Sequence, residues 1–395
     1  MDARGMDLAV EETLAGTLFI DIHTHLFHPG FGSLSLWGID ELLTYHYLEA
    51  ELFRFSSIRP EAYWALHKQQ RADLVWKTLF VENTPLSEAT RGVIAVLQAF
   101  GLNAGASTLD SVRAFFCKQD FAEHVRNVFQ LAGVSEVVMT NDPLDNEEAA
   151  LWKAGASGGQ GFMPALRLDR ILNDGATTDS DPRQFLEQSA ARMMPKYMAV
   201  SLPDSFTFPS ADLRTKLLRE AVLPACRQLD IPLALMIGVR RGVNPALRSA
   251  GDAAGRADMR SLEALCSEFP DNRFLVSMLS RENQHELCVY ARKFRNLLPF
   301  GCWWFLNNSS IVEEITRERL EMLGTSFIPQ HSDARVLEQL IYKWRNTRRT
   351  IAPILAAAYK RLEEDGRSVS RSDIQRDVNR LFRGNFEHWT TTHAR

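Results

Sequence analysis

The stretch Phe19-Ile20-Asp21-Ile22-His23-Thr24-His25, near the N-terminus, decides the fold. Its β-branched and aromatic residues predict a strand, and the i, i+2 spacing places both histidines on one face of that strand. Two imidazoles at the end of a strand are suited to bind one metal ion. A purely structural role for the pair is the alternative, because short motifs of this kind also occur without a metal.

A second stretch near the other end of the chain, Gln330-His331-Ser332-Asp333-Ala334-Arg335, offers a carboxylate. Asp333 would become a neighbour of His23 and His25 if the sheet between the two stretches closed on itself. Three protein ligands with one open position are typical of a catalytic zinc site. The alternative is that Asp333 caps a helix that starts at Ala334.

Strands and helices alternate along most of the chain between these two stretches. After the first strand, the expected strands are 136–140, 162–167, 197–202, 232–237, 274–278, 298–305 and 327–329. Such alternation implies parallel strands. Eight units predict a closed (β/α)8 TIM barrel, whose functional residues lie at the carboxyl ends of the strands. A Rossmann-like open sheet is the alternative, but the glycine-rich dinucleotide motif is missing.

One long region interrupts this alternation. Residues 36–131 contain several expected helices and no expected strand, so they predict a helical insertion after the first strand. The barrel would then comprise residues 1–35 and 132–395. The chain of 395 residues has room for both parts, because a barrel of this type takes about 250 residues.

Composition excludes several classes of protein. The formal net charge of −4 gives no electrostatic footprint for nucleic acid. No apolar run approaches the length of a membrane span, and the first residues lack the apolar core of a signal peptide. The five cysteines are scattered and show no metal-binding spacing, as is typical of reduced thiols. We therefore expect a cytoplasmic protein with neither nucleic-acid nor membrane partners.

Further polar residues lie where the barrel would carry its chemistry. Arg167 ends an apolar strand and could bind a carboxylate through both arms of its guanidinium, although an ion pair with Asp169 is the alternative. Arg335 could reach the cavity next to Asp333. The Tyr45-His46-Tyr47 segment of the insertion could form a lid over the site, or it could be the face of an ordinary amphipathic helix.

Five stretches, spread over most of the chain, together show a resemblance that no one of them would show alone. They are residues 21–26, 37–47, 165–169, 301–308 and 323–335. In these stretches the chain resembles the uronate (glucuronate) isomerases of the amidohydrolase superfamily. The resemblance implies a distorted (β/α)8 barrel with a helical insertion after strand 1. It also implies an aldose–ketose isomerase that interconverts D-glucuronate with D-fructuronate, and D-galacturonate with D-tagaturonate, by metal-assisted proton transfer between C2 and C1.

The resemblance also implies roles for individual residues. The metal ligands would be His23, His25 and Asp333, and the ion is expected to be Zn²⁺, with Mn²⁺ as the alternative. The implied catalytic residues are Asp333, Tyr47 and Arg335, with either Asp333 or Tyr47 as the base. The implied substrate-binding residues are His46, Arg167, Arg335 and Trp303. For Trp303, a place in the barrel core is the alternative. The expected partners are a hexuronate substrate and further copies of the chain in a homo-oligomer.

Two other functions remain open at this stage. A mononuclear metal-dependent hydrolase or decarboxylase of the same superfamily would keep the three metal ligands, and a non-catalytic sugar-acid binder would keep Arg167. Hydrolases of the superfamily often carry further ligands after strands four to six. Here the fourth strand ends in Val200-Ser201-Leu202, and the next two carry Met236 and Met278. The ligands of a binuclear hydrolytic centre are therefore missing.

Overall fold

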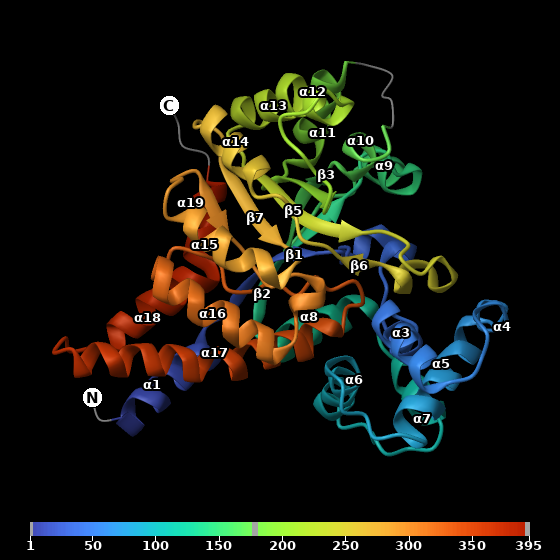
Figure 1. Ribbon diagram of the computed structural model, residues 1–395. Helices are drawn as coiled ribbons and strands as arrows, with labels where there is room; N and C mark the ends of the chain where they lie inside the picture. Colours follow the sequence, from blue (N-terminus) through green and yellow to red (C-terminus); the bar gives the residue numbers. More distant parts are fainter. Residues whose placement is uncertain (1–2, 176–180, 392–395) are drawn as a thin grey trace.

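A curled sheet of parallel strands forms the centre of the computed structural model, which describes residues 3–175 and 181–391 (Figure 1). The strand order is β1-β2-β3-β4-β5-β7-β8, and a short strand, β6, pairs antiparallel with β5. The strands are β1 Phe19–Thr24, β2 Val134–Asn141, β3 Phe162–Arg167, β4 Met198–Pro203, β5 Leu233–Arg240, β6 Ala253–Ala254, β7 Phe274–Met278 and β8 Leu297–Pro299. Consecutive parallel neighbours around a curled sheet are the topology of a barrel.

The barrel closes through a few hydrogen bonds on each side of the last segment rather than through a full eighth strand. Ile328 forms an isolated parallel bridge with Phe300, and its N–H donates to the carbonyl of Pro299 at 3.0 Å. On the other side of this segment, the N–H of Asp333 donates to the carbonyl of His23 at 3.2 Å. The last segment therefore joins the end of the sheet to its beginning, and the predicted distorted (β/α)8 barrel is confirmed.

Two predicted strands are shorter than expected. The strand expected at 298–305 ends at Pro299, and residues 304–306 form a 3-10 turn instead. The strand expected at 327–329 is reduced to the bridge at Ile328. Pro299 and Pro329 each lack the N–H that a continuing ladder would need.

Helices alone fill the region between β1 and β2. They are α2 Ile39–Leu43, α3 His46–Phe55, α4 Pro60–Trp64, α5 Lys68–Trp76, α6 Glu88–Ala99, α7 Asp110–Phe116 and α8 Phe121–Ala132. Residues 39–116 share an apolar cluster of their own, and α3 to α7 lie to one side of the sheet (Figure 1). In contrast, Val125 and Val128 of α8 belong to the main core. The boundary proposed at residues 36–131 stays a prediction.

The remaining helices surround the sheet or follow it in the sequence. They are α1 Ala3–Gly16, α9 Asn146–Lys153, α10 Asp169–Leu172, α11 Pro182–Met193, α12 Leu213–Leu217, α13 Leu223–Leu229, α14 Arg260–Glu268, α15 Gln284–Ala291, α16 Ser309–Leu323, α17 Gln339–Glu364, α18 Arg371–Asn379 and α19 Asn385–Thr390. Shorter helical turns are η1 Pro29–Leu34, η2 Lys77–Val81, η3 Leu218–Val222, η4 Pro245–Gly251, η5 Arg281–Asn283, η6 Trp304–Leu306 and η7 Arg380–Gly384. Within the described ranges, no helix is both long enough and apolar enough to cross a membrane.

The long helix α17 connects the insertion to the barrel. It packs against α6 and α8 and also against α1 and α16. Its Trp344 is buried, and the indole N–H donates to the carboxylate of Asp21 in β1 at 2.8 Å. The second oxygen of Asp21 accepts the N–H of Ser332 at 3.1 Å. Asp21 therefore fixes the first strand, the last barrel segment and α17 relative to one another.

Candidate metal and active site

A bulge in β1 orients the two histidines of the first strand. Asp21 lies opposite Val137 of β2, and Thr24 lies opposite Met139, so the β1 side has one residue more than its partner. Such a bulge turns side chains away from strict alternation. In agreement, Asp21 points to Trp344 outside the barrel, while the His23 ring lies 6.5 Å from the ring of Phe300 inside it.

Three side chains expected to bind a metal converge at this end of the barrel. Nε2 of His23 lies 3.8 Å from Oδ1 of Asp333, and Nε2 of His25 lies 3.4 Å from the same oxygen. One ligand atom from each residue lies within 4.8 Å of the other two. The structure therefore brings together all three residues that the sequence indicated.

Asp333 does not cap a helix. Helix α17 begins only at Gln339, and Asp333 has a positive φ of 53°. Its Oδ1 is buried and accepts no hydrogen bond from the described residues. The helix-cap alternative is wrong, because the chain turns back to pair with β1 at this point and the N–H of His25 donates to the carbonyl of Ala334 at 2.7 Å.

Two hydroxyl groups determine which nitrogen of each histidine carries the proton. The Tyr197 hydroxyl donates to the carbonyl of Ile22 at 2.7 Å, so it must accept the N–H from Nδ1 of His23 at 3.1 Å. In the same way, the Thr140 hydroxyl donates to the carbonyl of Thr24 at 2.9 Å and accepts from Nδ1 of His25 at 3.0 Å. Both Nε2 atoms therefore present lone pairs toward Asp333, as metal-binding histidines do.

The charge states agree with this arrangement. Burial lowers the pKa of His23 and of His25, so both rings are neutral near pH 7. Burial alone would raise the pKa of Asp333, but this pKa lies below its usual value overall, so its carboxylate is ionised. Two neutral imidazoles and one carboxylate around a common point are a suitable ligand set for a divalent cation. The described residues therefore fit a divalent metal ion.

Arg167 points from the end of β3 toward the same region. Its Nε lies 3.1 Å from Asp169, and Nη2 donates to the other oxygen of that carboxylate at 3.2 Å. The ion pair that was the structural alternative is thus present. Nη1 has no protein acceptor within the described residues, so the guanidinium keeps donors for a second anion. About 30% of the side chain is exposed, and it lines a cavity next to His25.

That cavity has a volume of about 320 Å³ and lies over the carboxyl ends of β1, β2 and β3. Its polar lining consists of His25, Ser33, Thr140, Asp142, Asp145, Glu148, Arg167 and Arg335. The volume is within the range of small-molecule sites, roughly 300–1,000 Å³. Charges of both signs around a hydroxyl and an imidazole suit a polar ligand.

Solved structures place this chain in a family. A uronate isomerase from Bacillus halodurans C-125 is 47% identical, with a TM-score of 0.96, over 99% of this chain and 97% of that chain. The chain belongs to the uronate isomerase family. Comparisons with family models and with curated proteins gave no match.

More distant structures share the fold of this uronate isomerase family member. A glucuronate isomerase from Caulobacter crescentus has a TM-score of 0.78 at 15% identity, over 100% of this chain and 95% of that chain. A uronate isomerase from Thermotoga maritima has a TM-score of 0.72 at 14% identity, over 98% and 97% of the two chains. At such low identity these two likenesses concern the fold alone.

In this uronate isomerase fold, the Tyr45-His46-Tyr47 segment begins helix α3 of the insertion. The His46 ring lies 5.5 Å from the ring of Trp304, and burial lowers the pKa of His46 to about 4. The ammonium of Lys343 lies 5.4 Å from the centre of the Tyr47 ring. Burial raises the pKa of Tyr47 well above its usual 10, so the phenol stays neutral. His46 and Tyr47 are thus half-buried, against Trp304 and Lys343 respectively.

The neighbouring residues Trp303 and Trp304 lie in different environments. Trp303 is buried with Phe300 and other side chains that fill the barrel. Trp304 is the member that contacts His46. A substrate-binding role for Trp303 stays a prediction, and Trp304 is an additional candidate that the sequence did not separate from its neighbour.

His331 is a buried member of the site that the sequence did not single out. Its ring centre lies 5.3 Å from that of His23, and neither ring nitrogen has a hydrogen-bond partner within the described residues. Gly301 makes room for this ring, because a Cβ at Gly301, where φ is +65°, would lie 1.9 Å from Cδ2 of His331. Its place within Gln330–Arg335, two residues before Asp333, was the only available signal.

Proposed function

We propose that this protein is an aldose–ketose isomerase of hexuronates, interconverting D-glucuronate with D-fructuronate and D-galacturonate with D-tagaturonate. The observation that carries the proposal is the 47% identity to a uronate isomerase over nearly the whole chain. The convergence of His23, His25 and Asp333 beside Arg167 supports it, because such a site combines metal ligands with a receptor for a carboxylate.

Arg167 is proposed to hold the substrate carboxylate. Asp169 occupies Nε and one donor of Nη2, so Nη1 and the second N–H of Nη2 remain for a substrate oxygen pair. His46 is proposed to donate a further hydrogen bond, since its Nε2 is buried and has no partner within the described residues. These contacts would fix the carboxylate end of the sugar and leave its aldehyde end toward Asp333.

The metal is proposed to be Zn²⁺, with Mn²⁺ as the alternative, and its ligands to be His23, His25 and Asp333. When bound, such an ion stabilises negative charge on the oxygens of the reacting carbon atoms. Arg335 lines the cavity next to His25 and is exposed, so its guanidinium is free to assist at the same oxygens.

Isomerisation requires removal of a proton from C2 and its delivery to C1 through an enediolate. Asp333 is ionised, whereas the raised pKa of Tyr47 keeps that phenol protonated. We therefore assign the base to Asp333 and a hydrogen bond to a substrate oxygen to the Tyr47 hydroxyl. Lys343 lies over the Tyr47 ring and restricts its position from the α17 side.

The direct test is incubation of purified protein with D-glucuronate or D-galacturonate, with detection of the keto product. The protein is treated with a chelator and then supplied with Zn²⁺, with Mn²⁺ or with no metal. D-glucose, which lacks the carboxylate, is the matched control and should not react. The absence of keto product from both uronates under every metal condition would overturn the proposal. Hydrolysis of lactones instead would support the alternative function, a mononuclear metal-dependent hydrolase.

A further inference from the structure

Lys343 is a buried cation on the long helix α17, beside Tyr47 of the insertion. The residue is only 5% exposed. Within the described part of the chain, its ammonium forms no ion pair and donates no hydrogen bond. A buried ammonium without acceptors is costly, because it gives up its hydration and gains no replacement. Since lysine is almost never fully buried unless it is paired, the presence of this charge needs a specific explanation.

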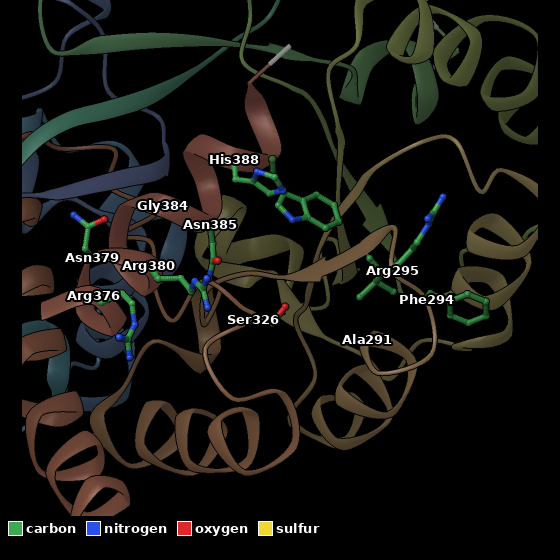
Figure 2. A pocket seen from close by; sticks show the side chains of 12 residues that line it. Ala291, Phe294, Arg295, Ser326, Arg376, Asn379, Arg380, Gly384, Asn385 and His388 are labelled. Atoms are coloured by element: carbon green, nitrogen blue, oxygen red, sulfur yellow. The ribbon is translucent and has the colours of Figure 1, made fainter. Parts of the chain in front are cut away.

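Cations at the molecular surface are in a different situation. A cavity of about 590 Å³ lies between β8 and the helices α18 and α19 (Figure 2). Three arginines that line it, Arg295, Arg376 and Arg380, are exposed, so water can hydrate them. Arg295 points away from Arg380, and these charges do not form one site (Figure 2). Water has little access to the ammonium of Lys343, which therefore depends on its protein surroundings.

Two tyrosine rings take the place of an anionic partner. Nζ of Lys343 lies 5.4 Å from the centre of the Tyr47 ring and 5.6 Å from the centre of the Tyr342 ring. Both distances fall within the roughly 6 Å over which a cation is attracted to the face of an aromatic ring. Tyr342 is itself packed tightly against α6, because a Cβ at Gly92 would lie 2.8 Å from its ring. Lys343 therefore connects Tyr47 to a well-packed part of α17.

The charge of Lys343 also acts within the candidate active site. Burial lowers the pKa of Lys343 to about 8, although the carboxylate of Asp333 acts in the opposite direction. The ammonium is thus still mostly protonated near pH 7. Burial lowers the pKa of His46 and of His331, and the charge of Lys343 lowers both further. The ammonium is therefore part of the electrostatic surroundings of the site and not a remote surface charge.

We propose that Lys343 is a positioning residue of the isomerase, whose ammonium holds the Tyr47 ring so that the phenol hydroxyl meets the substrate. This inference rests on the proposed function, which gives the Tyr47 hydroxyl a hydrogen bond to a substrate oxygen. The ammonium contacts the faces of the rings, and the Tyr47 hydroxyl has no hydrogen-bond partner within the described residues, so it stays available. An apolar side chain of similar length would fill the same space but would not attract the ring.

A double-mutant cycle with Tyr47 tests the proposal, measured on Zn²⁺-loaded protein with D-glucuronate. Lys343→Met replaces the ammonium with an unbranched, adaptable apolar side chain. This variant should lower kcat by about tenfold, the order expected for loss of a desolvated cation–π contact. KM should change by less than about twofold, because the proposed carboxylate contact at Arg167 is untouched. In the Tyr47→Phe background the same substitution should lower kcat by less than about twofold, since no hydroxyl remains to be positioned.

Thermal unfolding separates this role from a purely structural one. The folded state lowers the pKa of Lys343 from 10.5 to about 8, so the cost of burying its charge is fully present below about pH 8. Lys343→Met removes this cost and should unfold at the wild-type temperature or above it at pH 7. Lys360→Met is the matched control, since Lys360 lies on the same helix but pairs with Asp7, and it should keep the wild-type kcat.

Three results with an active wild-type protein would overturn the role of Lys343 alone. They are an unchanged kcat in Lys343→Met, a loss of kcat accompanied by a lower unfolding temperature, and an equal loss with and without the Tyr47 hydroxyl. The last result would indicate that Lys343 acts on the substrate independently of Tyr47. Absence of keto product from the wild-type protein would overturn the proposed function, and this inference with it.

Discussion

Nε2 of His25 lies 3.4 Å from Oδ1 of Asp333, and the hydrogen bond from Nδ1 of His25 to Thr140 leaves no proton between the two atoms. Nε2 of His23 faces the same oxygen at 3.8 Å in the same tautomer. Three lone pairs that converge in a buried site repel one another unless a cation lies among them. The described geometry therefore indicates a metal site. The hydrogen bonds to Tyr197 and Thr140 hold the two histidines in the tautomer that can bind the ion.

Tyr197→Phe should lower metal affinity by about 10- to 100-fold, the usual cost of removing a hydrogen bond to a metal-binding histidine. The phenyl ring keeps the packing, but Nδ1 of His23 loses its acceptor. Chelator competition measures the affinity. Tyr359→Phe, which loses a hydrogen bond to Asp377 remote from the site, is the matched control. Equal metal affinity in both variants would show that Tyr197 does not orient His23.

Arg167→Lys should weaken the use of uronates by at least about 1.5 kcal/mol in kcat/KM, since lysine keeps the charge but loses the planar fork. Metal content and thermal stability should stay near the wild-type values. Arg170→Lys, on the neighbouring helix α10, is the control and should keep full efficiency. If Arg167→Lys retains full efficiency, or unfolds and loses its metal, the role of Arg167 is structural, through its ion pair with Asp169.

Asp333→Asn should reduce turnover by roughly a hundredfold or more, because it removes the proposed base and one charged metal ligand together. Metal content is measured alongside turnover. To separate the two roles, turnover is also measured at saturating Zn²⁺, where the loss should persist. Wild-type turnover of the metal-loaded variant would exclude Asp333 as the base.

Glu148→Gln should change how stability depends on pH. Burial, with smaller effects from Asp142 and Asp145, raises the pKa of Glu148 from 4.5 to about 7. The folded state therefore binds this proton more tightly than the unfolded chain does. The associated stability is present below pH 4.5 and is lost as the pH rises through about 7.

Glutamine mimics the protonated carboxyl and can still accept from Asn141 and from the N–H of Asp142. The variant should therefore gain about 1 kcal/mol or more in unfolding free energy relative to the wild type between pH 5 and pH 8. Urea unfolding across this range measures the difference. Glu147→Gln, at the exposed neighbouring position, should show a much smaller change. A difference between Glu148→Gln and wild type that is independent of pH would show that Glu148 is not protonated by burial.

Much of the site could be predicted because its residues lie on strands with clear patterns. His23 and His25 end a short apolar strand, and Asp333 follows the last one, so the barrel topology alone brings them together. Tyr197 and Thr140 could not be found in this way, because they lie 174 and 115 residues from the histidines that they orient. Only the three-dimensional arrangement of β1, β2 and β4 makes them neighbours.

Other features escaped prediction for local reasons. The bulge after Asp21 depends on the pairing of β1 with β2, which no residue in β1 specifies by itself. The sequence also gives no means to decide which member of Trp303-Trp304 faces the barrel core.

Turnover in heavy water, followed by proton NMR, tests the central claim most directly. Wild-type protein loaded with Zn²⁺ is incubated with D-glucuronate in D₂O until the keto product and the starting sugar coexist. Proton transfer through an enediolate predicts D-fructuronate as the product and deuterium at C2 of the recovered D-glucuronate or at C1 of the product. No keto product, or a product that retains all its carbon-bound hydrogen over many turnovers, would contradict isomerisation by an exchangeable base at this site.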